Sequence, residues 1–222
     1  AFGFDKRTGI DLPNESAGYV LTKAEKKALS NKYPDAYPNG EWYTGDNVQL
    51  AIGQNVIVVT PLQLARAYAA FANGGTVYQP HVVWKILRPN SSTTDPSDVL
   101  RVIEPLVTGT VTLPPDVRSP IASGLGGVTS GFGTAASAFV GFDQQAFPIV
   151  GKTGTAQVDG RADTSLFASY GPALSPRWVV TAVMEESGFG AEASGEVTRR
   201  VYEVLANQAL TGAGTATNGS MD

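Results

Sequence analysis

The chain has 222 residues, 42% of them hydrophobic and 16% charged, so it can bury the core of one globular domain or of a large piece of one. Its formal net charge of −4 gives no basic field of the kind that binds nucleic acid. It contains no cysteine, which excludes disulfides, zinc–thiolate sites and cysteine nucleophiles.

The first part of the chain predicts loops around one short helix. Residues 1–20 are rich in glycine and read as a loop, a charged helix is expected at 22–30, and 31–47 is rich in turn residues. No apolar run has membrane-spanning length and no signal peptide opens the chain. The opening residues lack methionine and read as the middle of a longer protein, so any membrane anchor is expected upstream of this chain.

The clearest helix is expected to begin after Thr60. Thr60 is a good N-cap, Pro61 suits the first helical position, and Gln63 completes a capping box. Apolar residues then recur at helical spacing, namely Leu64, Ala67, Tyr68, Phe71 and Ala72. Asn73 and the two glycines that follow it predict the end of this helix.

The middle of the chain predicts extended structure followed by a second helix. Residues 76–87 read as extended and 89–98 as a polar surface loop. A helix is expected from Pro115, or from Pro120 with Ser119 as its N-cap. Its apolar face would consist of Val117, Ile121, Leu125 and Val128. Glycine-rich turns are expected at 130–135.

The last third predicts a sheet and a closing helix. Strands are expected near 147–157, 165–171 and 177–185, followed by a helix at 194–210. The valines at 197, 201 and 204, with Leu205, form one stripe of that helix. This order favours an α+β fold with helices packed on an antiparallel sheet. Residues 1–210 are expected to form the structured part, and 211–222 a disordered tail.

The segment Gly-Lys-Thr-Gly-Thr-Ala-Gln at 151–157 carries the sharpest chemical signal. Lys152 places an ammonium beside an anionic ligand, and the hydroxyls of Thr153 and Thr155 can bond a carboxylate. Gly154 lets a ligand approach the backbone, and an edge strand can add an extended peptide as a further strand. An ordinary strand with one lysine remains the alternative.

Two nucleotide-binding interpretations of glycine-rich segments fail. A P-loop needs a glycine where Ala146 stands, and it needs a helix where the residues after Thr155 read as a strand that ends in a turn. Residues 131–136 imitate a dinucleotide fingerprint, but no convincing strand precedes them and no suitable acidic residue follows at the expected spacing. We therefore interpret residues 131–136 as a turn.

Other candidate residues favour structural roles. His81 is the only histidine, so it cannot anchor a metal cluster, and no metal site is expected. Glu185 and Glu186 could act as acid and base, but they read as a solvated strand end before a glycine-rich turn.

Several segments together resemble the transpeptidase domain of penicillin-binding proteins. Gly-Ile-Asp-Leu-Pro-Asn-Glu at 9–15 is similar to a family segment, and its form favours the monofunctional, elongation or division class (class B). Ile-Gly-Gln at 52–54 is also similar, with Asn55 in place of the usual glycine. The helix and turn at 60–75, Gly-Thr-Ala at 133–135, and the Lys-Thr-Gly element follow in the family's order.

The resemblance implies a penicillin-binding/β-lactamase-like fold and serine acyl transfer on peptidoglycan stem peptides, without a cofactor. It implies that Lys152 supplies positive potential, that Thr153 and Thr155 bond the substrate carboxylate, and that Gly154 leaves room for the substrate backbone. The Thr155 N–H would form half of the oxyanion hole, so Lys152 and Thr155 would serve catalysis.

The chain departs from the family in lacking both the Ser-x-x-Lys and the Ser-x-Asn motif. In the family both precede the Gly-Ile-Asp-Leu-Pro segment, so we expect the nucleophilic serine outside this chain and the fold to be incomplete. A degenerate, non-catalytic cell-wall-binding or assembly module is the alternative. A β-lactamase or β-lactam sensor is a third, which residues 52–54 and 60–65 disfavour.

The resemblance also implies partners and a location. The ligands would be stem peptides ending in D-Ala-D-Ala and the β-lactams that imitate them. The protein partners would be the N-terminal part of the same protein and cell-elongation or division proteins, with no nucleic acid. The location would be the extracytoplasmic face of the bacterial membrane, with the anchor in an N-terminal segment absent from this chain.

Overall fold

The computed structural model describes residues 1–54, 57–91, 96–157, 160–188 and 191–208. Within the chain, contacts gather into two compact units, the first of residues 1–70 and 76–111 and the second of residues 71–75 and 112–222. The expected tail at 211–222 lies outside the described residues, as does Asn55. The expectation of one structured segment over 1–210 stays a prediction.

The first unit combines three helices with three small antiparallel strand pairs. The helices are α1 (Lys23–Lys32), α2 (Thr44–Ala51) and α3 (Pro61–Ala72), the last continuing into the second unit. The pairs are β1 (Tyr19–Val20) with β2 (Ile57–Val58), β3 (Thr76–Tyr78) with β6 (Val107–Thr110), and β4 (Lys85–Leu87) with β5 (Val99–Val102). Short 3₁₀ turns lie at Pro38–Gly40 and Pro96–Asp98.

Several predictions for this unit are confirmed and several elements were missed. The helix expected at 22–30 is α1, with Thr22 as its N-cap in a capping box. The expected extended segment 76–87 divides into β3 and β4. The sequence did not predict α2, the two-residue strands β1 and β2, or the strands β5 and β6.

The predicted capping box of α3 is confirmed. Gln63 N–H donates to Thr60 Oγ1 at 3.1 Å, and Thr60 N–H donates to Gln63 Oε1 at 2.9 Å. The Gln63 side chain is buried and also donates from Nε2 to the carbonyl oxygens of Lys6 and Ala17, at 2.9 and 2.7 Å. One side chain therefore both begins the helix and fastens the N-terminal segment to it.

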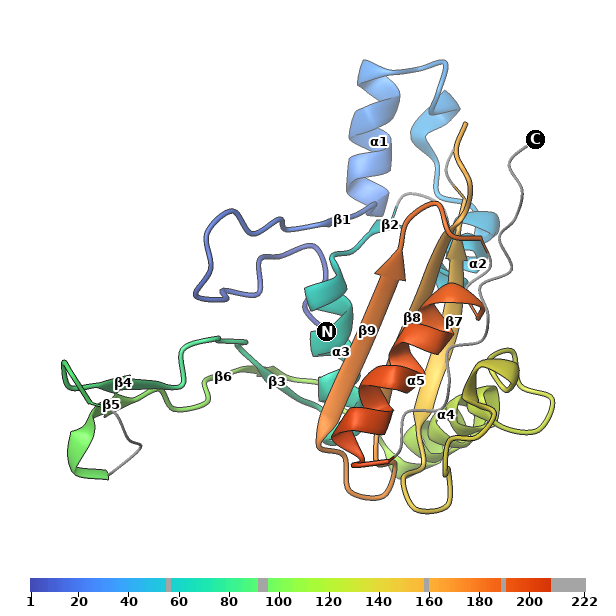
Figure 1. Cartoon of the computed structure of the whole chain (residues 1–222). Helices are drawn as coiled ribbons and strands as arrows, with labels where there is room; N and C mark the ends of the chain where they lie inside the picture. The colour runs from blue at the N-terminus through green and yellow to red at the C-terminus, as the bar shows by residue number, and fades with distance from the viewer. Residues whose placement is uncertain (55–56, 92–95, 158–159, 189–190, 209–222) are drawn as a thin grey trace. The chain divides into compact units, whose positions relative to one another are not determined.

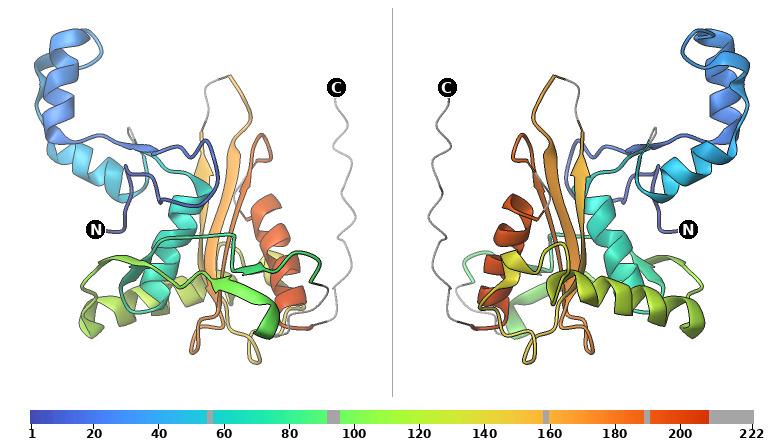
Figure 2. Two further views of the ribbon diagram at one scale, coloured as in Figure 1. Left: turned by 90° about the vertical axis from the view of Figure 1, so that its left-hand side faces the viewer. Right: turned by 90° about the vertical axis from the view of Figure 1, so that its right-hand side faces the viewer.

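The second unit is built on the antiparallel sheet β7-β8-β9. Its strands are β7 (Val150–Ala156), β8 (Thr164–Gly171) and β9 (Trp178–Met184), as predicted to within three residues. Helix α5 (Ala193–Leu205) and helix α4 (Pro115–Gly126) lie on opposite sides of this sheet (Figures 1 and 2). The 3₁₀ turns Gly127–Thr129 and Ser137–Phe139 connect α4 to β7. The α+β prediction is confirmed.

Helix α4 decides one alternative and corrects one expectation. It begins at Pro115 and runs through Pro120 to Gly126 as a single helix, so it does not restart at Pro120. Its expected apolar face does not face the core along its whole length, because Val117 and Ile121 are 45% and 46% exposed while Val128 is buried.

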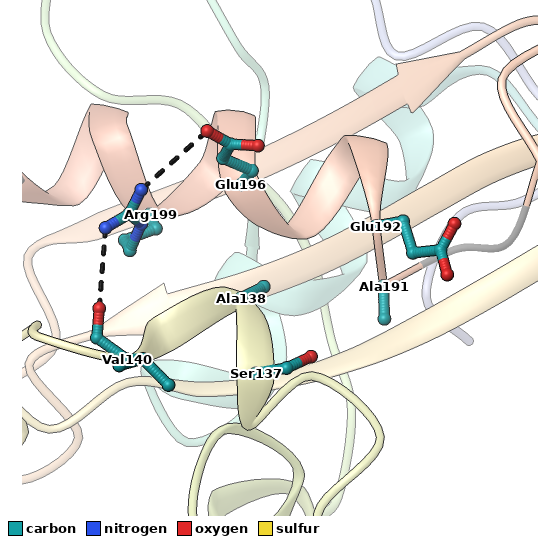
Figure 3. A pocket seen from close by; sticks show the side chains of 7 residues that line it. All are labelled: Ser137, Ala138, Val140, Ala191, Glu192, Glu196 and Arg199. Carbon is teal, nitrogen blue, oxygen red and sulfur yellow. Dashed lines mark hydrogen bonds and ion pairs between the residues drawn. The ribbon is translucent and has the colours of Figure 1, made fainter. Parts of the chain in front are cut away.

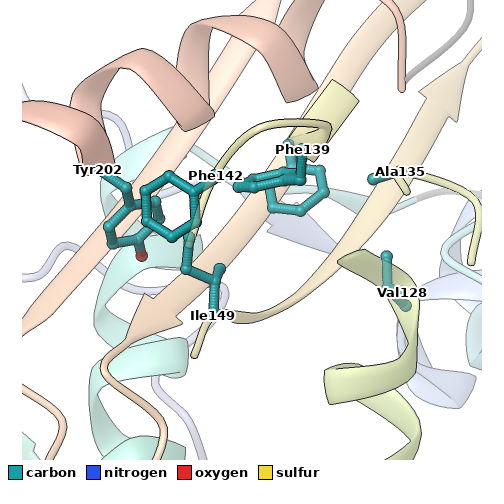
Figure 4. Close-up of a cluster of buried hydrophobic side chains, with 7 residues drawn as sticks. Val128, Ala135, Phe139, Phe142, Ile149 and Tyr202 are labelled. Atoms are coloured by element: carbon teal, nitrogen blue, oxygen red, sulfur yellow. The ribbon is translucent and has the colours of Figure 1, made fainter. Parts of the chain in front are cut away.

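An aromatic cluster fills the core between the sheet and α5 (Figure 4). Its members are Val128, Ala135, Phe139, Phe142, Ile149, Phe167 and Tyr202. The rings of Phe139 and Phe167 lie 5.7 Å apart between centroids. Tyr202 OH lies 3.1 Å from Ser169 Oγ, so the buried phenol has a partner, and burial raises its pKa. This cluster sets the position of β8 and α5.

Helix α5 presents a different face to the sheet from the one its valines suggest. Val197, Val201 and Val204 are 39%, 39% and 68% exposed, whereas Thr198 and Tyr202 are fully buried. The helix approaches β8 through small polar residues, and its Ser194 Oγ accepts from Ser165 Oγ at 2.7 Å. Leu205, the fourth member of the predicted stripe, packs against the core cluster, so only the three valines form an exposed apolar surface of this unit.

The described helices all fall short of the length and apolarity that crossing a membrane requires.

The aromatic cluster predicts unequal costs for two identical substitutions. Phe139→Ala should lower the free energy of unfolding by about 3–5 kcal/mol because it empties a buried site. Phe132→Ala, in the same connecting segment, should change it by less than about 0.5 kcal/mol because Phe132 is fully exposed. Urea unfolding of the complete protein with and without each substitution, under the same conditions, measures the difference, and equal costs would contradict this core.

The open stripe of α5 and the edge of β9 predict the behaviour of the chain by itself. We expect it to self-associate, to need a companion segment, or to be locally disordered, because water contacts the valines and the strand edge. Val197→Lys with Val201→Lys should reduce self-association measured by light scattering, whereas Val48→Lys on α2 should not. A monodisperse, cooperatively melting monomer of the unaltered chain would count against this expectation.

Candidate active site

The candidate site lies on β7, which carries residues 150–156 at one edge of the three-stranded sheet of the described residues. Lys152 is exposed, whereas Thr153, Gly154 and Thr155 are half-buried. The side chains of the motif are therefore not packed inside the core. The four predicted site residues Lys152, Thr153, Gly154 and Thr155 thus stand together on one strand, with one backbone edge turned away from β8.

Gly151 explains how β7 comes to lie so close to β8. It pairs with Ser169, and a Cβ added at Gly151 would lie 2.8 Å from both Phe167 Cε1 and Ser169 Cβ. Real Cβ atoms do not approach so closely, so a larger residue would push the strands apart. The glycine before Lys152 therefore belongs to the packing of the strand.

Gly154 faces more open surroundings. A Cβ added there would meet Leu166, its partner on β8, at an ordinary contact distance of 3.4 Å. This leaves the surface beside Lys152 uncrowded, as a site that admits a ligand backbone requires.

The ammonium and the hydroxyl groups of the motif are in hydrogen-bonding distance. Lys152 Nζ donates to the Thr153 carbonyl oxygen at 3.0 Å and to Thr153 Oγ1 at 3.3 Å. Thr153 Oγ1 also lies 3.0 Å from Oγ1 of Thr134, which comes from the turn between α4 and β7. Positive charge and directional hydroxyls thus meet at one point, and such a set favours an anion.

The remaining sequence candidates lie elsewhere. His81 belongs to the first unit, where its Nδ1 lies 2.8 Å from the Val83 carbonyl oxygen. Glu185 and Glu186 are exposed after β9, and Glu186 forms an ion pair of 3.4 Å with exposed Arg161. Residues 131–136 form a turn, as predicted, and β7 continues as a strand to Ala156, which confirms that no P-loop is present there.

Asp11 of the Gly-Ile-Asp-Leu-Pro segment has a structural partner within the first unit. Its carboxylate accepts hydrogen bonds from the backbone N–H groups of Val82 and Val83, at 2.7 and 3.0 Å. These two hydrogen bonds hold the pKa of Asp11 below its usual value, and the one from Val82 has the larger effect. The segment at 9–15 is therefore hydrogen-bonded to the backbone at Val82 and Val83 within the first unit.

A cavity of about 390 Å³ lies away from β7, between α5 and the turn at Ser137–Phe139 (Figure 3). Two of its charged lining residues contact each other, since Arg199 lies 3.8 Å from Glu196, and Arg199 also contacts the buried Glu203 behind the lining at 3.3 Å. Arg199 also donates to the Val140 carbonyl oxygen at 3.5 Å. The contacts of this cavity serve the attachment of α5, and none of its lining residues belongs to the Lys-Thr-Gly strand.

The fold and the motif together match one protein family. A family model described as the penicillin binding protein transpeptidase domain matches residues 1–203, and the chain therefore belongs to this family. This confirms the resemblance drawn from the sequence motifs.

The curated relatives are longer proteins. The peptidoglycan D,D-transpeptidase MrdA of Haemophilus influenzae is 29% identical over 229 residues, which cover 94% of this chain and 32% of that protein. MrdA of Acinetobacter baumannii is 30% identical over 91% of this chain and 29% of that protein. The chain thus spans about a third of the length of these relatives.

Solved structures show the same fold. A crystal structure of Pseudomonas aeruginosa PBP2 in complex with WCK 5153 has a TM-score of 0.70 and 28% identity, and it covers 92% of this chain and 41% of that one. Penicillin-binding protein 2B of Streptococcus pneumoniae has a TM-score of 0.71 and 24% identity, with 96% and 32% covered.

Proposed function

We propose that this chain is part of a peptidoglycan D,D-transpeptidase and supplies the Lys-Thr-Gly side of its active site. The observation that carries the proposal is the cluster of Lys152 Nζ and Thr153 Oγ1 on the edge strand of a transpeptidase-family domain. Its MrdA relatives bear the name of this activity.

The proposed reaction transfers an acyl group twice. A serine hydroxyl, outside this chain, attacks the carbonyl carbon between the two D-alanines of a stem peptide and loses its proton to a base. The bond to the terminal D-alanine breaks, and that D-alanine leaves after its nitrogen takes up a proton. An amine of a neighbouring stem peptide then attacks the acyl-serine ester, forms the cross-link and frees the serine.

The residues of β7 would serve the first step by binding and polarising the donor peptide. Lys152 would give positive potential near the serine and the terminal carboxylate, and the hydroxyls of Thr153 and Thr155 would bond that carboxylate. The Thr155 N–H would donate to the oxyanion, where the negative charge of the tetrahedral intermediate develops. The uncrowded surface at Gly154 would admit the substrate backbone.

The edge position of β7 suits an extended ligand. Backbone groups on a strand edge can pair with a peptide laid antiparallel or parallel to it, and these hydrogen bonds orient the peptide. β-Lactams would occupy the same place and acylate the serine, because their ring imitates the D-alanyl-D-alanine amide.

The whole protein would act at the extracytoplasmic face of the membrane, anchored by an N-terminal segment. Its N-terminal part would bring the serine to β7, and proteins of cell elongation or division would be its further partners. A Helicobacter pylori structure described as a complex between penicillin-binding protein PBP2 and MreC motivates the choice of such partners, although that likeness shows the fold alone.

One prediction of this proposal concerns the reaction of this chain by itself with penicillin. It should form no covalent adduct with labelled penicillin, because no Ser-x-x-Lys occurs in its 222 residues. Gel fluorescence or intact mass measures this, and a labelled band at the mass of the chain would contradict it. The same assay on the complete reading frame should label the protein, whereas an unlabelled complete protein whose upstream serine is substituted would favour the non-catalytic module.

Another prediction of this proposal concerns Lys152 in the complete protein. Lys152→Met should slow acylation by penicillin about 100-fold or more, because it removes the charge beside the bound carboxylate. Arg161→Met removes one positive charge from the exposed end of the same sheet and should leave the rate within about twofold. Second-order acylation rates from stopped-flow or quench labelling test this, and similar losses in the two variants would refute a local role for Lys152.

A further inference from the structure

Thr134, in the turn before β7, is within hydrogen-bonding distance of the Lys-Thr-Gly segment. Its Oγ1 lies 3.0 Å from Thr153 Oγ1 although the residues are 19 positions apart, and either hydroxyl can be the donor. Both residues belong to the second unit. Folding of that unit therefore adds a third group to the pair formed by Lys152 and Thr153.

The turn that carries Thr134 is held by its backbone. Ala135 N–H donates to the Val128 carbonyl oxygen at 2.9 Å, and Ala135 is fully buried. A Cβ added at Gly133 would clash with the Gly127 carbonyl oxygen, so the turn packs against the chain more closely than another residue allows. The Thr134 side chain itself is exposed, so its hydroxyl adds little to this packing.

The donors and acceptors available at Thr153 Oγ1 indicate which hydroxyl donates in its hydrogen bond with Thr134. An ammonium only donates, so Lys152 Nζ occupies one lone pair of Thr153 Oγ1 at 3.3 Å. A hydroxyl has one proton and two acceptor lone pairs. If Thr153 donates a hydrogen bond to a ligand carboxylate, one acceptor lone pair remains on Thr153 Oγ1, and Thr134 Oγ1, 3.0 Å away, can then bond to Thr153 only as the donor.

We infer that Thr134 is a positioning residue that donates its hydroxyl proton to Thr153 and thereby keeps the Thr153 proton on the carboxylate of the bound donor. This inference rests on the proposed function and deepens it. Thr134 acts through Thr153 and does not touch the reacting atoms. Each hydrogen bond in the chain from Thr134 to Thr153 to the carboxylate polarises the next, which strengthens the last one.

Four variants of the complete protein test this with two ligands. The ligands are a penicillin with its free carboxylate and the methyl ester of the same penicillin. Thr134→Val keeps the shape of the side chain without its hydroxyl and should slow acylation by the free acid about 3- to 10-fold. The ester rate should stay within about twofold, and Thr134→Ser should restore the rate with the free acid.

The third variant carries Thr153→Val alone, and the fourth carries Thr153→Val together with Thr134→Val. Because Thr134 acts through Thr153, its substitution should have no further effect in that background. An equal loss with acid and ester, no rescue by serine, or the same loss in the Thr153→Val background would overturn the inference. A complete protein that penicillin never labels would instead overturn the proposed function on which it rests.

Discussion

The close approach of β7 and β8 at Gly151 is the constraint on which the candidate site depends. Phe167 and Ser169 leave no space for a side chain there, so the two strands lie close together at the start of the motif. Phe167 in turn belongs to the aromatic cluster that α5 closes with Tyr202. The core therefore sets the position of the strand, and the alternation of side chains along the strand then leaves Lys152 in water.

Local signals predicted the elements that local chemistry determines. The capping box at Thr60 and Gln63 marked the start of α3, and the three strands of the main sheet followed from their apolar, β-branched residues. Helix α2 has weaker signals, since it contains two poor helix formers, Gly45 and Asn47, and begins after an aromatic N-cap. The 2.7 Å ion pair between Asp46 and Lys26 helps to hold it, and such a tertiary contact has no sequence pattern.

Helix α5 shows why hydrophobic periodicity alone chooses the wrong face. Gly195 lies so close to the turn before β7 that an added Cβ would be 3.0 Å from Ala138 Cβ, so small residues determine which face approaches. Arg199 and Glu203 are buried there as a 3.3 Å pair, which is tolerated because the charges compensate each other. The valines are thereby turned outward and are exposed in the part of the chain that the structure describes.

The ammonium and the hydroxyl groups of the candidate site have different physical roles. Four site residues could be named from the Lys-Thr-Gly pattern, but Thr134 could not, because its contact exists only after the turn at 133–135 has packed. An exposed ammonium attracts any anion and gives little direction, whereas hydroxyl bonds depend on orientation. Since Thr153 is half-buried between Lys152 and Thr134, its rotamer is restrained by folding before a ligand arrives. Less ordering entropy would then be lost when the proposed carboxylate ligand binds, because the hydroxyl that bonds it already has a restrained orientation.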